Sequence, residues 1–593
     1  MKGDYSRDTF DPAKHFSRVL MQQGRVQLDA DWNEQGAIFL HYLQTLAADL
    51  IGAHGGPVDQ LGFEIIAISP KTDLTKLTDL SIGVGRYYVD GILCENYPPV
   101  TNVMQPKSPA RTSGGVEIAL EMTSGHSQSS YRHQVNYPMD PQSEEFKKDL
   151  VPPLFVYLDV WERHVTAFED DDIREVALGG PDTAARAKVV WQVKIAAIGK
   201  GDNMIDLTVP NLDCKNFDND KAWADFRKQL QDKNLGMLRA RAFVPETSTD
   251  VCIVSPEARY RGAENQLYRV EIHRGGTANQ GPTFKWSREN GSAVFPIQSV
   301  SDQLVTLENM GRDERFGLAV GDWVEVVDDY YTSRGKADPL LRVEAVDPIG
   351  MTVTLSHTPQ AGVGRNPNLH PLLRRWDQQE GDAKTGGLTL TDGAAHIIER
   401  TKNNPHWLNL EDGVQVQFEP GATYRQGDYW LIPARTATGD VEWPGRSDNP
   451  RPMPPKGVAH HYAPLGVVFR RDDTEDPYFG VIDLRHQIES LGKCVCPRIE
   501  VLNDPTTFET NNPISFFAHV GSSNPGLGYS WTAAVTGGTG TVNPTPNPPP
   551  NKSKFTVTAS QGVREITATV VVTGLPAGCP DRATGKAARK SGP

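Results

Sequence analysis

The chain has 593 residues, enough for about three to five domains of roughly 100–200 residues each. Its net charge of −14 argues against a broad nucleic-acid-binding surface, because phosphate binding requires clustered lysine and arginine. No apolar run reaches the roughly 20 residues of a membrane helix, and the polar N-terminal sequence lacks the core of a secretion signal, so synthesis in the cytoplasm without membrane insertion is expected.

The first predicted unit comprises residues 1–56, which differ in pattern from the rest of the chain. Residues 24–32 alternate apolar and polar side chains, which is the period of a half-buried strand. Apolar residues then recur at three- and four-residue steps, which predicts a helix over residues 31–51. Asp31 and Glu34 have the spacing of a capping box at its start.

Residues 1–23 combine many polar side chains with apolar ones that follow no regular period. Such a segment is poorly suited to forming a core alone but suits an extended arm that lies along a partner. We therefore predict that residues 1–50 attach the protein to its own copies or to a neighbouring subunit; the alternative is that the arm wraps its own β-domain. The candidate assembly residues are Phe10, Phe16, Leu20, Met21, Trp32, Ile38, Tyr42 and Leu46.

Most of the remaining chain has the pattern of strands, so the predicted fold is mainly β and multidomain, with β-barrel and sandwich domains. A β-rich domain is expected over residues 57–260. Within it, residues 81–97 predict a hairpin that turns at an Asp-Gly pair. Residues 154–168 and 187–198 predict long strands, and residues 216–235 are compatible with a helix.

Two further β-rich units are expected over residues 261–365 and 366–493. In the first of them, residues 317–355 contain short strands separated by turns, which is the spacing of a small SH3-like barrel.

The C-terminal part predicts an immunoglobulin-like sandwich over residues 497–576, from five short strands in roughly eighty residues. The proline-rich residues 543–553 cannot pair in a sheet and are expected to form an exposed loop. The small, basic residues 577–593 predict a flexible tail.

The cysteines and the first acidic cluster have ordinary structural explanations. Six cysteines are too few for a disulfide framework, and Cys494 and Cys496 are expected to be free thiols. Asp29, Asp31 and Asn33 start like a calcium loop, but the glycine and the final glutamate of such a loop are missing.

Two other groups of possible ligands have the same kind of explanation. The aspartates at 170–172 are expected to pair with Arg174 or Arg186. His460 and His461 are adjacent, so on a strand they point to opposite faces. We therefore predict neither a metal site nor a cofactor.

The sequence contains no nucleophile elbow, zinc-binding helix, phosphate-binding loop or dinucleotide fingerprint, so we predict no catalytic residue and no enzymatic activity. Acidic β-proteins still offer many carboxylate pairs, which keeps a glycan-cleaving appendage open as an alternative. Trp407, Trp430 and Trp443 are candidates for stacking sugars in a glycan-binding adhesin, against a role in the core or an interface.

The opening MKGDYSRDTFDP and the run VLMQQGRVQLDADWNEQ resemble a bacterial family associated with phage tails and extracellular contractile injection systems. The segments GRYYVDGILCEN, TFKWSRENGSAVFPI and GDYWLIPARTATGDVEW agree with it, so the resemblance covers roughly residues 1–490. The C-terminal unit resembles PKD or immunoglobulin-like modules.

The resemblance implies a structural component of a phage-tail-like, virion-like contractile particle: a baseplate-associated, shield- or cage-like, or fibre-like protein. Its expected partners are its own copies in a homo-oligomer and other particle or baseplate proteins, with a cell-surface glycan as the partner in the adhesin alternative. Release from the cell is expected only as part of the particle.

Overall fold

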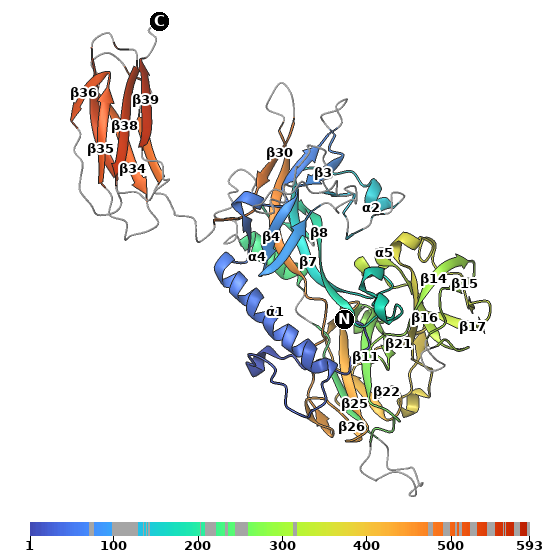
Figure 1. Cartoon of the computed structure of the whole chain (residues 1–593). Coiled ribbons are helices and arrows are strands. Elements are labelled where there is room, and N and C mark those ends of the chain that lie inside the picture. The colour runs from blue at the N-terminus through green and yellow to red at the C-terminus, as the bar shows by residue number, and fades with distance from the viewer. Residues whose placement is uncertain are drawn as a thin grey trace. The chain divides into compact units, whose positions relative to one another are not determined.

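The structure is a computed structural model that describes residues 1–69, 76–97, 129–134, 136–137, 139, 143–201, 203–207, 221–231, 235–243, 259–311, 317–471, 478–489, 498–504, 507–508, 513–521, 530–541, 552–560, 563, 565–573 and 582–589. Its contacts divide the chain into two compact units, Met1–Ile488 and Glu489–Pro593. Strands predominate in both units, which confirms the predicted mainly-β, multidomain fold (Figure 1).

The long N-terminal helix α1 (Asp29–Ile51) confirms the predicted helix and begins two residues earlier. It ends at Gly52, whose φ of 91° is readily adopted only by glycine. The strand predicted over residues 24–32 is wrong. Residues 25–28 belong to no strand, and the residues after them form the first helical turn, where the Asp31 carboxylate accepts a hydrogen bond from the backbone N–H of Leu28.

Three sheets share one core in the first unit. The four-stranded sheet has the order β31 (Gln487–Ile488), β1 (His54–Pro57), β4 (Gly85–Val89) and β5 (Ile92–Asn96). The five-stranded sheet has the order β30 (Tyr478–Asp483), β29 (His461–Arg471), β7 (Leu154–Val165), β8 (Arg186–Ile198) and β9 (Met204–Ile205). A three-stranded sheet contains β2 (Ile65–Ile68), β3 (Asp79–Ile82) and β6 (Ser129–Ser130). Large buried side chains such as Phe63, Tyr87 and Trp191 fill the core between them.

The hairpin predicted over residues 81–97 is confirmed, and its turn fixes the place of α1. Asp90 and Gly91 join β4 to β5 with positive φ angles of 47° and 79°. A Cβ atom at Gly91 would lie only 2.0 Å from the backbone oxygen of Gln44 in α1. The glycine therefore allows helix and hairpin to touch backbone to backbone.

The second half of this unit contains a sheet pair and a barrel. The six-stranded sheet has the order β20 (Leu390–Thr391), β21 (Ala394–His396), β13 (Thr283–Ser287), β11 (Gln266–Arg274), β25 (Tyr429–Arg435) and β26 (Asp440–Val441). It shares a core with β10 (Leu238–Ala242), β23 (Val414–Phe418) and β22 (Leu408–Asn409). The closed barrel has the order β14 (Val294–Ser301), β15 (Leu304–Leu307), β18 (Thr352–Leu355), β17 (Leu341–Asp347), β16 (Trp323–Val327) and β19 (Leu372–Trp376).

The remaining elements of the first unit are short. Two-stranded pairs are formed by β12 (Gly276–Thr277) with β24 (Thr423–Tyr424) and by β27 (Gly445–Arg446) with β28 (Asn449–Pro450). Besides α1, the α-helices in the described residues of this unit are α2 (Glu144–Lys147), α4 (Lys221–Leu230) and α5 (Asp329–Ser333). Helix α4 lies within residues 216–235, whose sequence is compatible with a helix.

Strands that are distant in sequence pair with one another. In the five-stranded sheet, β29 pairs with β7, and in the six-stranded sheet β25 pairs with β11. Segments from the predicted units 57–260 and 366–493 thus share one sheet, and segments from 261–365 and 366–493 share another.

The C-terminal unit contains two four-stranded sheets, and the immunoglobulin-like sandwich remains a prediction. One has the order β32 (Arg498–Asp504), β34 (Pro513–Gly521), β37 (Lys552–Ala559) and β36 (Gly538–Thr541), and the other β33 (Thr507–Phe508), β39 (Arg582–Arg589), β38 (Glu565–Thr573) and β35 (Ser530–Thr536). The prediction of a flexible tail over residues 577–593 is wrong for β39, which pairs with β38. Strand pairing uses backbone N–H and C=O groups, so small side chains do not prevent it. Most of the loop predicted at 543–553, together with Cys494 and Cys496, lies outside the described residues.

Candidate assembly site

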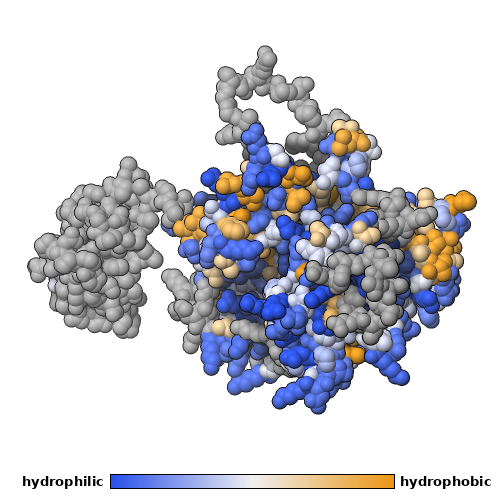
Figure 2. All heavy atoms as spheres, turned by 90° about the horizontal axis from the view of Figure 1, so that it is seen from below, coloured by the Kyte–Doolittle hydropathy of each residue, from blue (hydrophilic) through white to orange (hydrophobic). Residues whose placement is uncertain are grey.

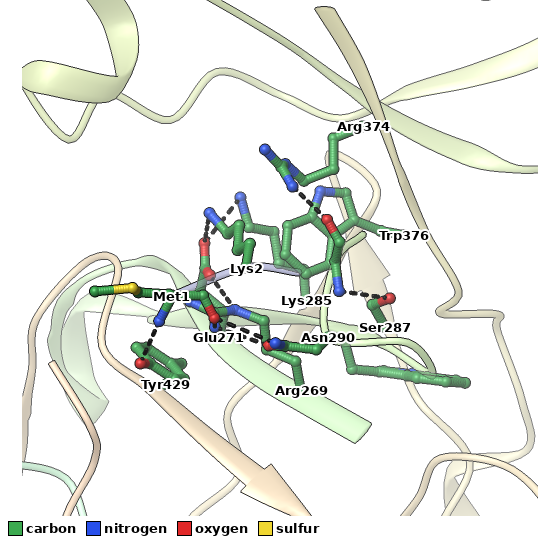
Figure 3. A network of polar contacts seen from close by, with 12 residues as sticks. Met1, Lys2, Arg269, Glu271, Lys285, Ser287, Asn290, Arg374, Trp376 and Tyr429 are labelled. Carbon is green, nitrogen blue, oxygen red and sulfur yellow. Dashed lines mark hydrogen bonds and ion pairs between the residues drawn. The ribbon is translucent and has the colours of Figure 1, made fainter. Parts of the chain in front are cut away.

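The first three residues of the chain lie at the junction of the six-stranded sheet and the barrel (Figure 3). Lys2 Nζ lies 3.0 Å from Glu271 Oε1 on β11 and 5.7 Å from the ring centre of Trp376 on β19. The side-chain amide of Asn290 donates hydrogen bonds to the backbone oxygens of Met1, at 3.2 Å, and Gly3, at 3.0 Å. This end of the arm is therefore held by both its backbone and its charge.

Glu271 is the centre of a buried ion-pair network. It accepts a hydrogen bond from Arg269 at 2.6 Å and lies 3.5 Å from Lys285 Nζ, which also pairs with Glu325 of the barrel at 2.6 Å. Burial alone would raise the pKa of Glu271, but the three cations Lys2, Arg269 and Lys285 hold that pKa well below its usual value. Burial lowers the pKa of Lys2 to about 8. The inserted lysine thus completes a network that links sheet and barrel.

Residues 5–9 continue along the surface of the same unit through polar contacts. Tyr5 Oη lies 2.8 Å from His164 Nε2, and the backbone N–H of Ser6 donates to Asp29 Oδ2 at 2.8 Å. The next three residues make the pairs Arg7–Glu442, Asp8–Lys456 and Thr9–Glu34. We call residues 1–9 the anchored half of the arm.

Residues 10–28, the free half of the arm, leave large apolar side chains in solvent. A hydrogen bond from the Val19 N–H to Gln35 ties this half to α1. The exposed apolar side chains are Phe16, Leu20, Met21, Val26 and Leu28. Leu20 keeps 69% and Val26 84% of its maximal exposure, so these residues contribute little to the core of their own chain.

Helix α1 presents a row of apolar side chains that nothing in the described chain covers. Only Ala30 and Ile38 are buried along its length. The exposed apolar side chains, each 42–65% exposed, are Trp32, Phe39, Leu40, Tyr42, Leu43, Leu46 and Leu50. Figure 2 shows both hydrophilic and apolar areas on one face of the molecule. Large exposed apolar groups that lie together commonly mark a contact surface.

The structure gives different surroundings to the eight predicted assembly residues. Ile38 is buried against its own chain, and the Phe10 ring is partly buried with its centre 5.8 Å from that of His41. The six that are exposed on the free half and the helix are Phe16, Leu20, Met21, Trp32, Tyr42 and Leu46.

Sequence reasoning missed the anchoring role of Lys2, for which a lone lysine near a terminus gives no signal. It also left Phe39, Leu43 and Leu50 out of the candidate set. The helical period that selected Trp32 and Leu46 also contains these three residues.

The polar groups weighed as ligands have protein partners. Asp171 pairs with Arg174 at 3.0 Å, as predicted. His460 and His461 contact different carboxylates, those of Asp159 and Asp90. Among the described residues, no three histidine, cysteine or acidic side chains are grouped as a metal site would require.

The three tryptophans proposed for stacking sugars lie within or against the protein. Trp430 is buried, and its indole N–H donates to the Met453 backbone oxygen. Trp443 packs against the same core. The guanidinium of Arg241 covers the ring of Trp407 at 3.9 Å.

The fold and the site define a β-rich multidomain protein with an N-terminal arm anchored by buried charge and an exposed apolar helix. The chain belongs to a family of unknown function (DUF6519), whose model matches residues 1–233 and 229–515. None of the curated proteins matches the sequence. In the described part of the chain, no helix is both long and apolar enough to cross a membrane.

One solved structure with a partial match is that of the S-layer protein rSbsC(31-844), at 11% sequence identity and a TM-score of 0.12. The match covers 51% of this chain and 54% of that chain. A TM-score this low carries nothing over to the present protein.

Proposed function

We propose that this protein is a structural component of a phage-tail-like contractile injection particle and that it assembles through α1 and the free half of its arm. The observation that carries the proposal is the row of seven exposed apolar side chains on α1. The particle itself is suggested by the long sequence motifs that resemble proteins of such systems.

The free energy gained by burying the exposed side chains of α1 can be compared with the free-energy cost of association. Complete burial of one large apolar side chain contributes about 1.5–3 kcal/mol. Because the seven side chains on α1 are roughly half buried already, burying the rest of them would contribute roughly 5–10 kcal/mol to the free energy of association. Association costs about 4–15 kcal/mol in lost freedom. The helix alone is therefore marginal as an interface, and the apolar residues of the free half of the arm supply the remainder.

The charges favour a second copy of the same chain as the partner. Helix α1 carries Asp29, Asp31, Glu34 and Asp49 and no lysine or arginine. Residues 12–28 carry Lys14, Arg18 and Arg25 and no acidic residue. Residues 12–28 of one copy thus complement the helix of another in charge as well as in apolar character.

Incorporation into particles tests the proposal. The double variant Leu43→Asp with Leu46→Asp places two charges on the apolar row, whereas Ile349→Asp makes the same change at a 96% exposed residue of the barrel. We expect the unchanged protein and the Ile349→Asp control to sediment with purified particles and the double variant to remain in the soluble fraction. Full occupancy of the double variant in particles would overturn the proposed role of α1. Absence of the unchanged protein from the particles would overturn the proposal that it is a particle component.

A further inference from the structure

A cavity of about 220 Å³ lies between the free half of the arm and α1. The residues that line it include the aromatic Phe10, Phe16 and Tyr42, the histidine His41 and the acidic Asp11 and Glu34. Aromatic and acidic residues from two separate segments thus line one small space.

The volume restricts what the cavity holds. At roughly 30 Å³ per molecule it would hold about seven waters. Pockets for drug-sized ligands have volumes of about 300–1,000 Å³. The cavity therefore has room for the end of a single long side chain.

The chemistry of the walls favours a cation. Aromatic faces attract ammonium and guanidinium groups, and a nearby carboxylate strengthens that attraction. Lys14 Nζ already lies 6.0 Å from the ring centre of Phe16. In the described contacts, Glu34 Oε2 accepts a hydrogen bond from Thr9 and Asp11 Oδ1 accepts one from Ala13, which leaves one oxygen of each carboxylate for an incoming donor.

We propose that this cavity binds a guanidinium group, donated by Arg18 or Arg25 in the arm of a second copy. Both arginines are exposed, and within the described chain neither forms an ion pair. A guanidinium suits the site better than an ammonium, because its planar fork pairs with carboxylates while its face stacks on rings. This inference rests on the proposed assembly with a second copy and names the contact that gives that assembly its specificity.

Peptide binding to the full-length protein tests the contact. The probe is a fluorescent peptide with the sequence of residues 15–28, HFSRVLMQQGRVQL, titrated by anisotropy at a protein concentration low enough to limit self-association. We expect saturable binding that weakens with added salt. Binding is expected to weaken at least tenfold when the arginine that enters the cavity is replaced by glutamine in the peptide, or when the protein carries Glu34→Gln.

Asp49→Asn is the matched control, because Asp49 is acidic and on the same helix but does not line the cavity. The peptide variants leave the folding of the protein untouched, so their result holds even if Glu34→Gln is unstable. Absence of binding, or equal binding by both single arginine variants, the double arginine variant and the parent peptide, would overturn the inference. If the peptide does not bind while the Leu43→Asp with Leu46→Asp variant still fails to enter particles, the inference is wrong and the proposed function stands.

Discussion

The two halves of the N-terminal arm reverse the usual relation between polarity and burial. The anchored half is rich in charge, yet Lys2 lies against a buried glutamate and a tryptophan. The free half contains larger apolar side chains, and they are left in solvent. Buried charges are kept only where they are paired, and exposed apolar groups gathered together mark contact surfaces. The anchored half therefore serves the fold, and the exposure of the free half supports our proposal that it serves assembly.

This division has a practical consequence for experiments. Deletion of residues 2–23 would remove the ion pair of Lys2 together with the apolar residues of the free half. Loss of assembly after such a deletion would have two explanations. Single substitutions separate them.

The largest expected effect is that of Glu271→Ala. Removal of this carboxylate leaves Lys2, Arg269 and Lys285 without their common partner. The free energy of unfolding, measured in urea, should therefore fall by about 3–5 kcal/mol. Glu344→Ala, at an exposed glutamate on β17, should change that free energy by less than about 0.5 kcal/mol. Equal effects of the two variants would mean that the buried network does not stabilise the fold.

Lys2→Met should cost less than Glu271→Ala, about 1.5–3 kcal/mol, which is the usual net contribution of a charged hydrogen bond. The cost is smaller because Glu271 keeps Arg269 and Lys285 as partners, and because the methionine side chain still packs on Trp376. Urea unfolding of this variant measures the contribution of the anchored half. A value near zero would show that the inserted end contributes nothing to stability.

A pH effect is expected from His164, the partner of Tyr5. Burial, followed by repulsion from nearby cations, lowers the pKa of His164 from 6.5 to about 3. Because the unfolded chain binds a proton more readily than the folded one, the stability due to neutral His164 is present above pH 6.5 and is lost as the pH falls toward 3. The urea midpoint should therefore fall more steeply below pH 6.5 in the unchanged protein than in His164→Gln. Parallel curves would contradict this assignment.

The smallest expected effect on folding is that of Tyr42→Ser on the exposed row of α1. About half of the Tyr42 side chain is exposed, so the free energy of unfolding should change by less than about 0.5 kcal/mol. The same variant should weaken self-association, because the ring lines the proposed cavity. A large loss of stability would show that α1 is packed more firmly than its exposure indicates.

Local patterns in the sequence predicted the elements that depend on local chemistry. The helix over residues 31–51 follows from its apolar period, and the hairpin follows from Asp90 and Gly91, since an Asp-Gly pair adopts positive φ angles readily. The error at residues 24–32 arose because four alternating residues fit a strand, whereas the carboxylate of Asp31 closes the first turn of a helix. The strand β39 was missed because its pairing uses backbone groups, which small side chains do not reveal.

Contacts between segments that are distant in the chain could not be predicted from the sequence. The ion pair of Lys2 with Glu271 and the pairing of β7 with β29 depend on how sheets assemble, and no local period records that. The sequence predicted the candidate assembly residues only in part. The helical period selected Trp32 and Leu46 correctly as exposed apolar residues, but only the structure shows that Ile38 of the same helix is buried.

The central claim is that α1 and the free half of the arm join copies of this chain, and the mass of the protein in solution tests it most directly. Sedimentation equilibrium of the unchanged protein and of Ile349→Asp at micromolar concentration should give a multiple of the 65.2 kDa chain. The Leu43→Asp with Leu46→Asp variant should give 65.2 kDa, with an unfolding midpoint close to that of the unchanged protein. A monomeric unchanged protein, or a double variant with the mass of the oligomer, would contradict the account.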